Sequence, residues 1–194
     1  MKTKTKLNLQ EIIEIYNHKS LDAAIIEAKA QQKRNPESIA LNQILGAFLI
    51  EKKQYLASIE YLSNGLSMDP KSPYLYNLRS ISLLETGRIN PAEEDARQAI
   101  KFDSNNAQYH YQLGTIHQKQ SKYVEAISSF ITAIELNKNL VQAFVSIGNC
   151  LTQTNEIERG LSIIKYATGA ISLDSEGNVE ITGRNLNAAY QNCR

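Results

Sequence analysis

The chain has 194 residues, 42% of them hydrophobic, and its 21 basic and 20 acidic side chains give a formal net charge of +1. This length suffices for one sizeable globular domain, and the near-neutral charge gives no bulk electrostatic reason to bind nucleic acid or anionic lipid. The longest purely apolar runs, such as residues 47–50, are too short to span a membrane. Two cysteines without a C-x-x-C pair suit a reducing compartment, so we expect a cytoplasmic protein.

The chain repeats itself with a period of 34 residues. Leu45-Gly46, Leu113-Gly114 and Ile147-Gly148 share one register, and Pro36 stands 34 residues before Pro70. A fixed period of this size is the signature of stacked units, each of which buries its apolar face only against a neighbour. The sequence therefore predicts an all-α stack of helix pairs with an extended surface for a partner.

Residues 1–38 are expected to form a degenerate helix pair at the start of this stack. Ile12 and Ala24 fit the apolar register, whereas Glu11 and Gln31 stand where apolar or small residues belong. An end unit has one face without a neighbour, so an atypical first unit is what a stack needs. The basic start is not followed by the apolar stretch of a signal peptide, which again favours the cytoplasm.

Two helix pairs are predicted next, over residues 39–72 and 73–106. The first has Ser58 at the small position of its second helix, where alanine is expected. The second has Arg79-Ser80 in the place that Leu-Gly takes in other units. Both departures put polar side chains at positions that the register predicts to be buried.

Two further pairs are predicted over residues 107–140 and 141–174. The first is the best formed, since Leu113-Gly114 lies on its first helix and small or apolar residues stripe the second at the spacing of one buried face. Gly114, paired by spacing with Ala126, is expected to let the two helices approach closely. In the last unit the closing segment, residues 170–174, arrives three residues late, so an extra turn must be absorbed.

Residues 175–194 are expected to be a capping segment, with Leu186, Ala189 and Tyr190 on one face of a short helix. Residues 170–182 allow two structures. Their register with earlier helix ends favours a helix, and this is our prediction. The rival is a hairpin, because Ile171 and Leu173 alternate before a turn-forming stretch and Val179 and Ile181 alternate after it.

The recurring small, aromatic and apolar residues, best seen in residues 107–140, resemble the tetratricopeptide repeat (TPR) family. The resemblance covers residues 39–174 well and residues 1–38 weakly. It implies a right-handed superhelix, an α-solenoid, with four clear units and a degenerate N-terminal one. It also implies a protein-interaction scaffold whose first helices line a concave groove.

Carried onto this chain, the family's outward-pointing first-helix positions give twelve candidate groove residues. None of them is acidic or basic, so the resemblance implies a neutral groove that offers amides, hydroxyls and apolar patches to a peptide. The bland alternative is that Ile50, Ile81 and Leu84 pack against neighbouring helices and that the rest is ordinary surface. The twelve residues are Gln43, Ala47, Ile50, Asn77, Ile81, Leu84, Tyr111, Thr115, Gln118, Val145, Asn149 and Thr152.

Family members that bind the C-terminal carboxylate of chaperones use Lys, Arg and Asn at set positions. The matching places in this chain carry no cation, so a free carboxylate would lose its hydration without a charged partner. We therefore predict that this chain does not bind a chaperone tail. In the two possible frames these places are Gln43, Ala47, Leu78, Gln108 and Gln112, or Asn77, Ile81, Gln112, Gln142 and Ser146.

No pattern in the sequence indicates catalysis, a cofactor or a metal. His110 and His117 are seven residues apart, a wider spacing than the four that a helical metal pair prefers, and both are expected to pack within the repeat. Cys150 is expected to be a small core residue, and a disulfide to Cys193 is not expected. Glycine-rich phosphate loops and zinc patterns are absent from the sequence.

The function that these observations favour is a non-catalytic adaptor that binds a peptide segment of another protein. Two alternatives stay open: the substrate-recruiting arm of a larger glycosyl- or sulfotransferase-like enzyme, and an assembly factor for a pilus or secretion system. The sequence names no partner, and a homo-oligomer is compatible with it.

Overall fold

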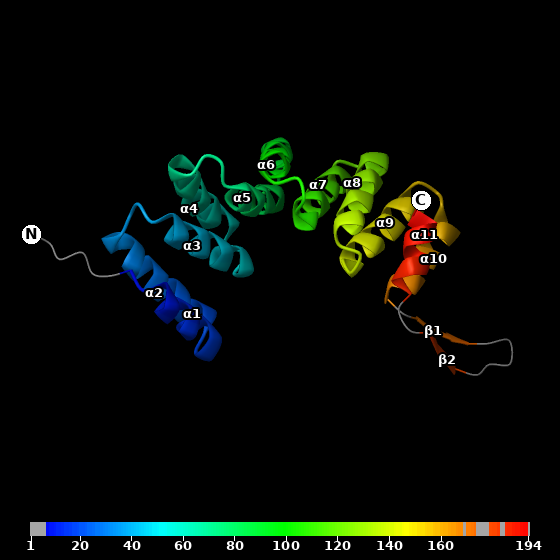
Figure 1. Cartoon of the computed structure of the whole chain (residues 1–194), viewed down its shortest axis with the longest axis horizontal. Coiled ribbons are helices and arrows are strands. Elements are labelled where there is room, and N and C mark those ends of the chain that lie inside the picture. Colours follow the sequence, from blue (N-terminus) through cyan, green and yellow to red (C-terminus); the bar gives the residue numbers. More distant parts are fainter. Residues whose placement is uncertain (1–6, 169, 174–178, 183–184, 194) are drawn as a thin grey trace, which may run out of the picture. The chain divides into compact units, whose positions relative to one another are not determined.

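The computed structural model describes residues 7–168, 170–173, 179–182 and 185–193 (Figure 1). The chain divides into two compact units, Met1–Phe102 and Asp103–Arg194. Both consist of short-looped helices that pack on their sequence neighbours, so the predicted all-α stack of helix pairs is confirmed. None of the described helices combines the length and the apolar character needed to cross a bilayer.

The first unit contains three helix pairs, in which each helix packs against the next. Serine caps begin three of its helices: the hydroxyls of Ser20, Ser38 and Ser72 accept hydrogen bonds from backbone amides in the first turn. The six helices are α1 (Leu9–His18), α2 (Leu21–Arg34), α3 (Ile39–Glu51), α4 (Tyr55–Met68), α5 (Pro73–Glu85) and α6 (Ile89–Phe102).

The 34-residue period is also written in the backbone. Lys53, Gly87, Ser121 and Asn155 stand 34 residues apart, and each has a positive φ between 58° and 76° in the turn inside a helix pair. Only one of the four is glycine, the residue that adopts this conformation without strain. The turn therefore recurs in the same register even where the side chain does not favour it.

The core of the first unit is apolar, with polar side chains buried where the repeat pattern departs from alanine and glycine. Gln31, at a misfit position, is buried and exchanges two hydrogen bonds with the backbone of Asn8, which holds the start of α1 on α2. The fully or largely buried apolar residues of α1–α5 include Ile12, Ala24, Ala28, Leu41, Leu45, Leu62, Leu66 and Leu75.

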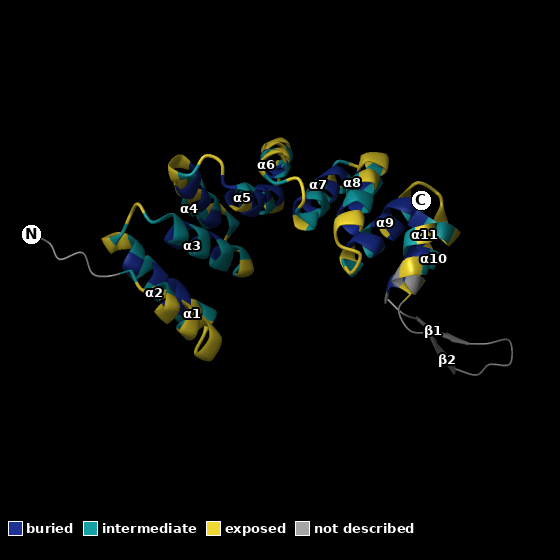
Figure 2. Ribbon diagram, in the orientation of Figure 1, coloured by how far each residue is buried: buried dark blue, intermediate teal, exposed yellow. Residues whose placement is uncertain are grey.

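The second unit contains two helix pairs, a hairpin and a last helix. They are α7 (Ala107–Lys119), α8 (Tyr123–Leu136), α9 (Val141–Gln153), α10 (Ile157–Thr168), β1 (Ala170–Leu173), β2 (Val179–Thr182) and α11 (Leu186–Cys193). Figure 2 shows the buried faces of α7–α9 turned toward their neighbouring helices. One continuous cluster that includes Phe130, Phe144, Ile147, Ile163 and Ala189 forms its core.

Glycines set the closest helix approaches in this unit. A Cβ atom on Gly114 would lie 2.6 Å from the ring of Phe130, so the predicted close approach of α7 and α8 is confirmed. Gly148 and Gly160 face each other across α9 and α10, where a Cβ on either would lie 2.5–2.7 Å from the other's carbonyl oxygen. The sequence register included Gly148 and missed Gly160.

The helix predicted over residues 170–182 is wrong, and the hairpin alternative is correct. Helix α10 ends at Thr168, and β1 pairs antiparallel with β2 so that Ile171 lies opposite Ile181. The register with earlier helix ends matched positions, whereas the apolar residues here alternate with a period of two and are rich in strand-forming Ile and Val. The helical cap is confirmed: Ala189 is buried and Tyr190 packs against the core cluster, while the Leu186 side chain lies outside the described residues.

Candidate functional site

All twelve candidate groove residues lie on the first helices of the pairs, α3, α5, α7 and α9. In the first unit Ala47 and Ile50 are half-buried and pack against the cluster of Leu62, Leu66, Leu75 and Leu78. Gln43 and Ile81 are also half-buried. The first unit therefore offers only fragments of an accessible apolar surface on these helices.

Asn77 and Leu84 do not point outward as expected. Their side chains are only 5% and 8% exposed. The reason is that α5 packs against α3, α4 and α6, so neighbouring helices cover most of its surface. The amide oxygen of Asn77 is buried without a hydrogen-bond partner among the described residues, and it offers no accessible surface to a ligand.

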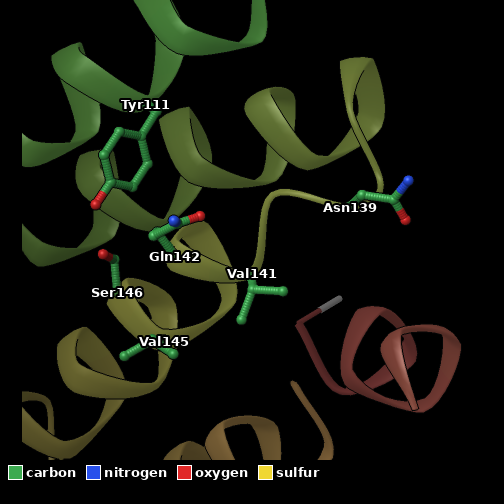
Figure 3. A pocket seen from close by; sticks show the side chains of 6 residues that line it. All are labelled: Tyr111, Asn139, Val141, Gln142, Val145 and Ser146. Carbon is green, nitrogen blue, oxygen red and sulfur yellow. The ribbon is translucent and has the colours of Figure 1, made fainter. Parts of the chain in front are cut away.

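In the second unit a depression of about 540 Å³ lies over α7, α9 and the segment between α8 and α9. Two candidates, Tyr111 and Val145, line it. Figure 3 shows the Tyr111 ring directed toward Gln142 and Ser146, with Asn139 at the opposite rim. The residues that line it are Tyr111, Asn139, Val141, Gln142, Val145 and Ser146, and none of them is charged.

The Tyr111 ring is held in place from behind. Its centroid lies 5.4 Å from that of Phe130, with the planes tilted by 45°, and it packs against the core of the unit. Such a tilted pair restrains the ring without covering its outer face. The site therefore presents a fixed aromatic surface beside two valines, with the amide of Gln142 and the hydroxyl of Ser146 next to it.

A second depression of about 410 Å³ brings together three other candidates, Gln118, Asn149 and Thr152. The Thr152 hydroxyl already donates to the backbone carbonyl of Asn149 at 2.7 Å. Lys119 also lines this depression, so it carries one positive charge that the candidate set did not include. Thr115, the remaining candidate, donates its hydroxyl to the Tyr111 carbonyl at 3.0 Å.

Sequence reasoning thus found part of this site. It selected Tyr111 and Val145 from the first-helix rule, and it considered Gln142 and Ser146 only as places where a carboxylate clamp would need cations. Asn139 was missed because it precedes α9, where a rule about helix faces does not apply. The signal that could have found Gln142 and Ser146 is their spacing of four on the same helix as Val145.

The histidines and cysteines are packing residues. His117 is 7% exposed, with its Nδ1 atom 3.4 Å from the Ser129 hydroxyl, and the Nε2 atom of His110 lies 2.9 Å from the carbonyl of Ser104. Cys150 is fully buried, as predicted, and both cysteines are free thiols. Burial raises the pKa of the Cys150 thiol from 9.0 to about 11, so it remains protonated at neutral pH.

Comparisons with known proteins agree with this fold. Human DnaJ homolog subfamily C member 7 is 30% identical over 92 residues, which make up 47% of this chain and 19% of that protein. The chain thus spans about a fifth of that relative's length. Among solved structures, MamA from Desulfovibrio magneticus RS-1 has a TM-score of 0.73 at 14% identity, covering 83% of this chain and 91% of that one.

YrrB, described as a TPR protein with an unusual peptide-binding site, has a TM-score of 0.65 at 15% identity, with 82% of each chain covered. At these identities the structural likeness shows the fold alone. The family evidence comes from the sequence, because the model described as "Integrator complex subunit 8, TPR repeats" matches residues 3–160. This match covers most of the chain, which therefore belongs to that family of tetratricopeptide repeat proteins.

Proposed function

We propose that the chain is a non-catalytic adaptor that binds a peptide segment of a partner protein, with its principal site in the depression around Tyr111. The observation that carries this proposal is the lining of that depression: a restrained tyrosine ring and two valines beside Gln142 and Ser146, with no charged residue among them. The TPR fold is a protein-interaction fold, and its members are typically not enzymes. The proposal adds to this a location and a type of ligand.

The chemistry of the lining defines the ligand. Burying a Leu- or Ile-sized side chain contributes roughly 1.5–3 kcal/mol, whereas a neutral hydrogen bond contributes about 0.5–1.5 kcal/mol. One or two apolar ligand side chains on Tyr111 and Val145 therefore supply most of the affinity. The Gln142 amide and Ser146 hydroxyl fix the register of the peptide backbone. A terminal carboxylate gains nothing here because the lining offers it no cation.

The similarity to YrrB supports this proposal at the level of the fold, because that protein is described as having a peptide-binding site on the same architecture. The half-exposed first helices of the second unit are the elements that present Tyr111, Val145 and Ser146 to solvent. We infer that this unit contributes more to binding than α3 and α5, whose candidates are largely covered.

A displayed library of random peptides, selected on the full chain, provides a probe that does not depend on the identity of the partner. We expect apolar peptides, and we expect Tyr111→Ala to weaken the best of them by roughly 1–3 kcal/mol. Tyr74→Ala is the matched control, since Tyr74 is 46% exposed on the first turn of α5, and it should leave the affinity unchanged. Calorimetric titration measures both variants.

The salt dependence of the same titration tests the neutral character of the site. Because the lining is uncharged, the affinity should change by less than about tenfold between low and high salt. Selection of mainly acidic peptides, a larger salt effect, or an unaltered affinity in Tyr111→Ala would each place the binding site elsewhere.

A further inference from the structure

Helix α10 carries an uncovered apolar stripe. Ile157 and Leu161, four residues apart and therefore on one face, are 51% and 57% exposed. In the preceding pair the residues at the same register, Tyr123 and Ile127, are half-buried and pack against the core. The stack thus leaves open at α10 a surface that it covers at α8.

Helix α11 packs on a different side of α10. The Nε atom of Arg159 donates to the backbone carbonyl of Asn192 at 2.8 Å, and Ile163 is fully buried. The buried stripe and the open stripe are therefore distinct faces of the same helix. Covering the open stripe requires another element in addition to α11.

Charges on the open stripe indicate what covers it. Glu158 lies three residues before Leu161 and Lys165 four residues after it, and both are exposed. Neither forms an ion pair within the described part of the chain. An antiparallel copy of this helix, related by a two-fold axis beside Leu161, would bring Glu158 of each copy opposite Lys165 of the other.

We propose that the chain forms a symmetric dimer in which α10 packs antiparallel on α10 of a second copy, burying Ile157 and Leu161 and pairing Glu158 with Lys165. A two-fold interface needs a self-complementary surface, which this opposite-charge pattern around a leucine provides. Head-to-tail stacking is disfavoured, because the first helix of the stack exposes Glu11 and Glu14. The peptide site on α7 and α9 is a separate surface, so the two proposals stand independently.

Sedimentation equilibrium of the full chain tests the dimer. An interface of one helix face is small, so we expect a dissociation constant on the order of 100 µM. Leu161→Glu should weaken association by at least about tenfold, because it places two carboxylates at the two-fold axis. Leu56→Glu is the matched control, since Leu56 is 60% exposed at the start of α4, and it should not change association. A chain that stays monomeric up to about ten times that concentration, or equal dimerisation of Leu161→Glu and wild type, overturns the proposal.

Charge reversal tests the antiparallel register with variants that change only exposed side chains. Glu158→Lys and Lys165→Glu should each self-associate more weakly than wild type at low salt, because like charges then face each other. Mixed in equal amounts they should form a heterodimer at least about threefold tighter than either homodimer, since one copy carries two positive and the other two negative charges. Absence of this preference overturns the proposed pairing. Circular dichroism of each variant shows that its helices are retained.

Discussion

At the scale of single residues, the departures from the repeat pattern are compensated by specific polar contacts. Ser58, at the small position of α4, donates to the Gly46 carbonyl at 2.9 Å and accepts from Ser82 at 3.0 Å. Arg79 forms a two-pronged ion pair with Asp95 at 2.7 and 2.8 Å, and Asp95 is only 5% exposed. The sequence showed these residues as exceptions, but their partners depend on how α3–α6 pack and could not be read from spacing alone.

The buried thiol of Cys150 predicts a pH dependence of stability. Its pKa is about 11 in the folded chain against an ordinary 9.0, because burial disfavours the thiolate. The unfolded chain therefore releases a proton first as the pH rises above about 9, and the folded state loses stability between about pH 9 and 11. Below about pH 8 both states keep the proton, so the thiol makes no pH-dependent contribution.

Urea unfolding of wild type and Cys150→Ala, at about pH 8 and about pH 10.5, measures this effect. Other titrating groups are common to both proteins and cancel in the comparison. The free energy of unfolding of wild type should fall further than that of Cys150→Ala. An equal fall in both would show that this thiol ionises as easily in the folded as in the unfolded chain.

At the scale of elements, the 34-residue register predicted where the repeat helices lie because helix pairs need apolar and small residues at set positions. It did not reveal the left-handed turns at Lys53, Ser121 and Asn155, whose side chains give no such signal, whereas Gly87 does. It failed at residues 170–182, where strand-forming alternation overrides positional similarity. The hairpin also bears on the recruiting-arm alternative, since the chain leaves the helical pattern after Thr168 but returns in α11, which packs on α10.

The contact between α9 and α10 predicts that Gly148→Ala is strongly destabilising. The new Cβ would lie 2.7 Å from the Gly160 carbonyl oxygen and 2.5 Å from Ile164, so the backbones must separate. Such overpacking typically costs about 1–3 kcal/mol, and here it should outweigh the roughly 1 kcal/mol that alanine contributes as a better helix former. We expect a net loss of about 2 kcal/mol in the free energy of unfolding.

Gly87→Ala is the informative comparison for this variant. A Cβ there meets nothing within 4 Å, but the φ of 76° strains any residue other than glycine, so a loss of about 1 kcal/mol is expected from conformation alone. Chemical denaturation of both variants ranks the two mechanisms. A Gly148→Ala protein as stable as wild type would mean that α9 and α10 are not in the close contact described.

At the scale of the whole molecule, the two compact units have separate cores. Clusters around Leu45 and Leu75 stabilise the first unit, and the cluster around Phe130 and Ile147 stabilises the second. The peptide site and the α10 stripe both belong to the second unit. The sequence predicted the class of site from the family resemblance, but it spread the candidates evenly over both units, because burial of Asn77 and Leu84 depends on packing that a per-unit register does not contain.

This separation predicts that residues 103–194 fold and bind peptide without residues 1–102. Repeat proteins derive their stability from contacts within and between neighbouring units, so a fragment that keeps its own core should retain a cooperative transition. The depression around Tyr111 is lined only by residues of this fragment. Expressed alone, the fragment should show helical circular dichroism and bind a peptide selected on the full chain within about threefold of the full-length affinity. Tyr111→Ala in the fragment should reproduce the loss seen in the full chain. A folded fragment without affinity would show that the first unit supplies part of the site, whereas an unfolded fragment would show that the second core depends on the first.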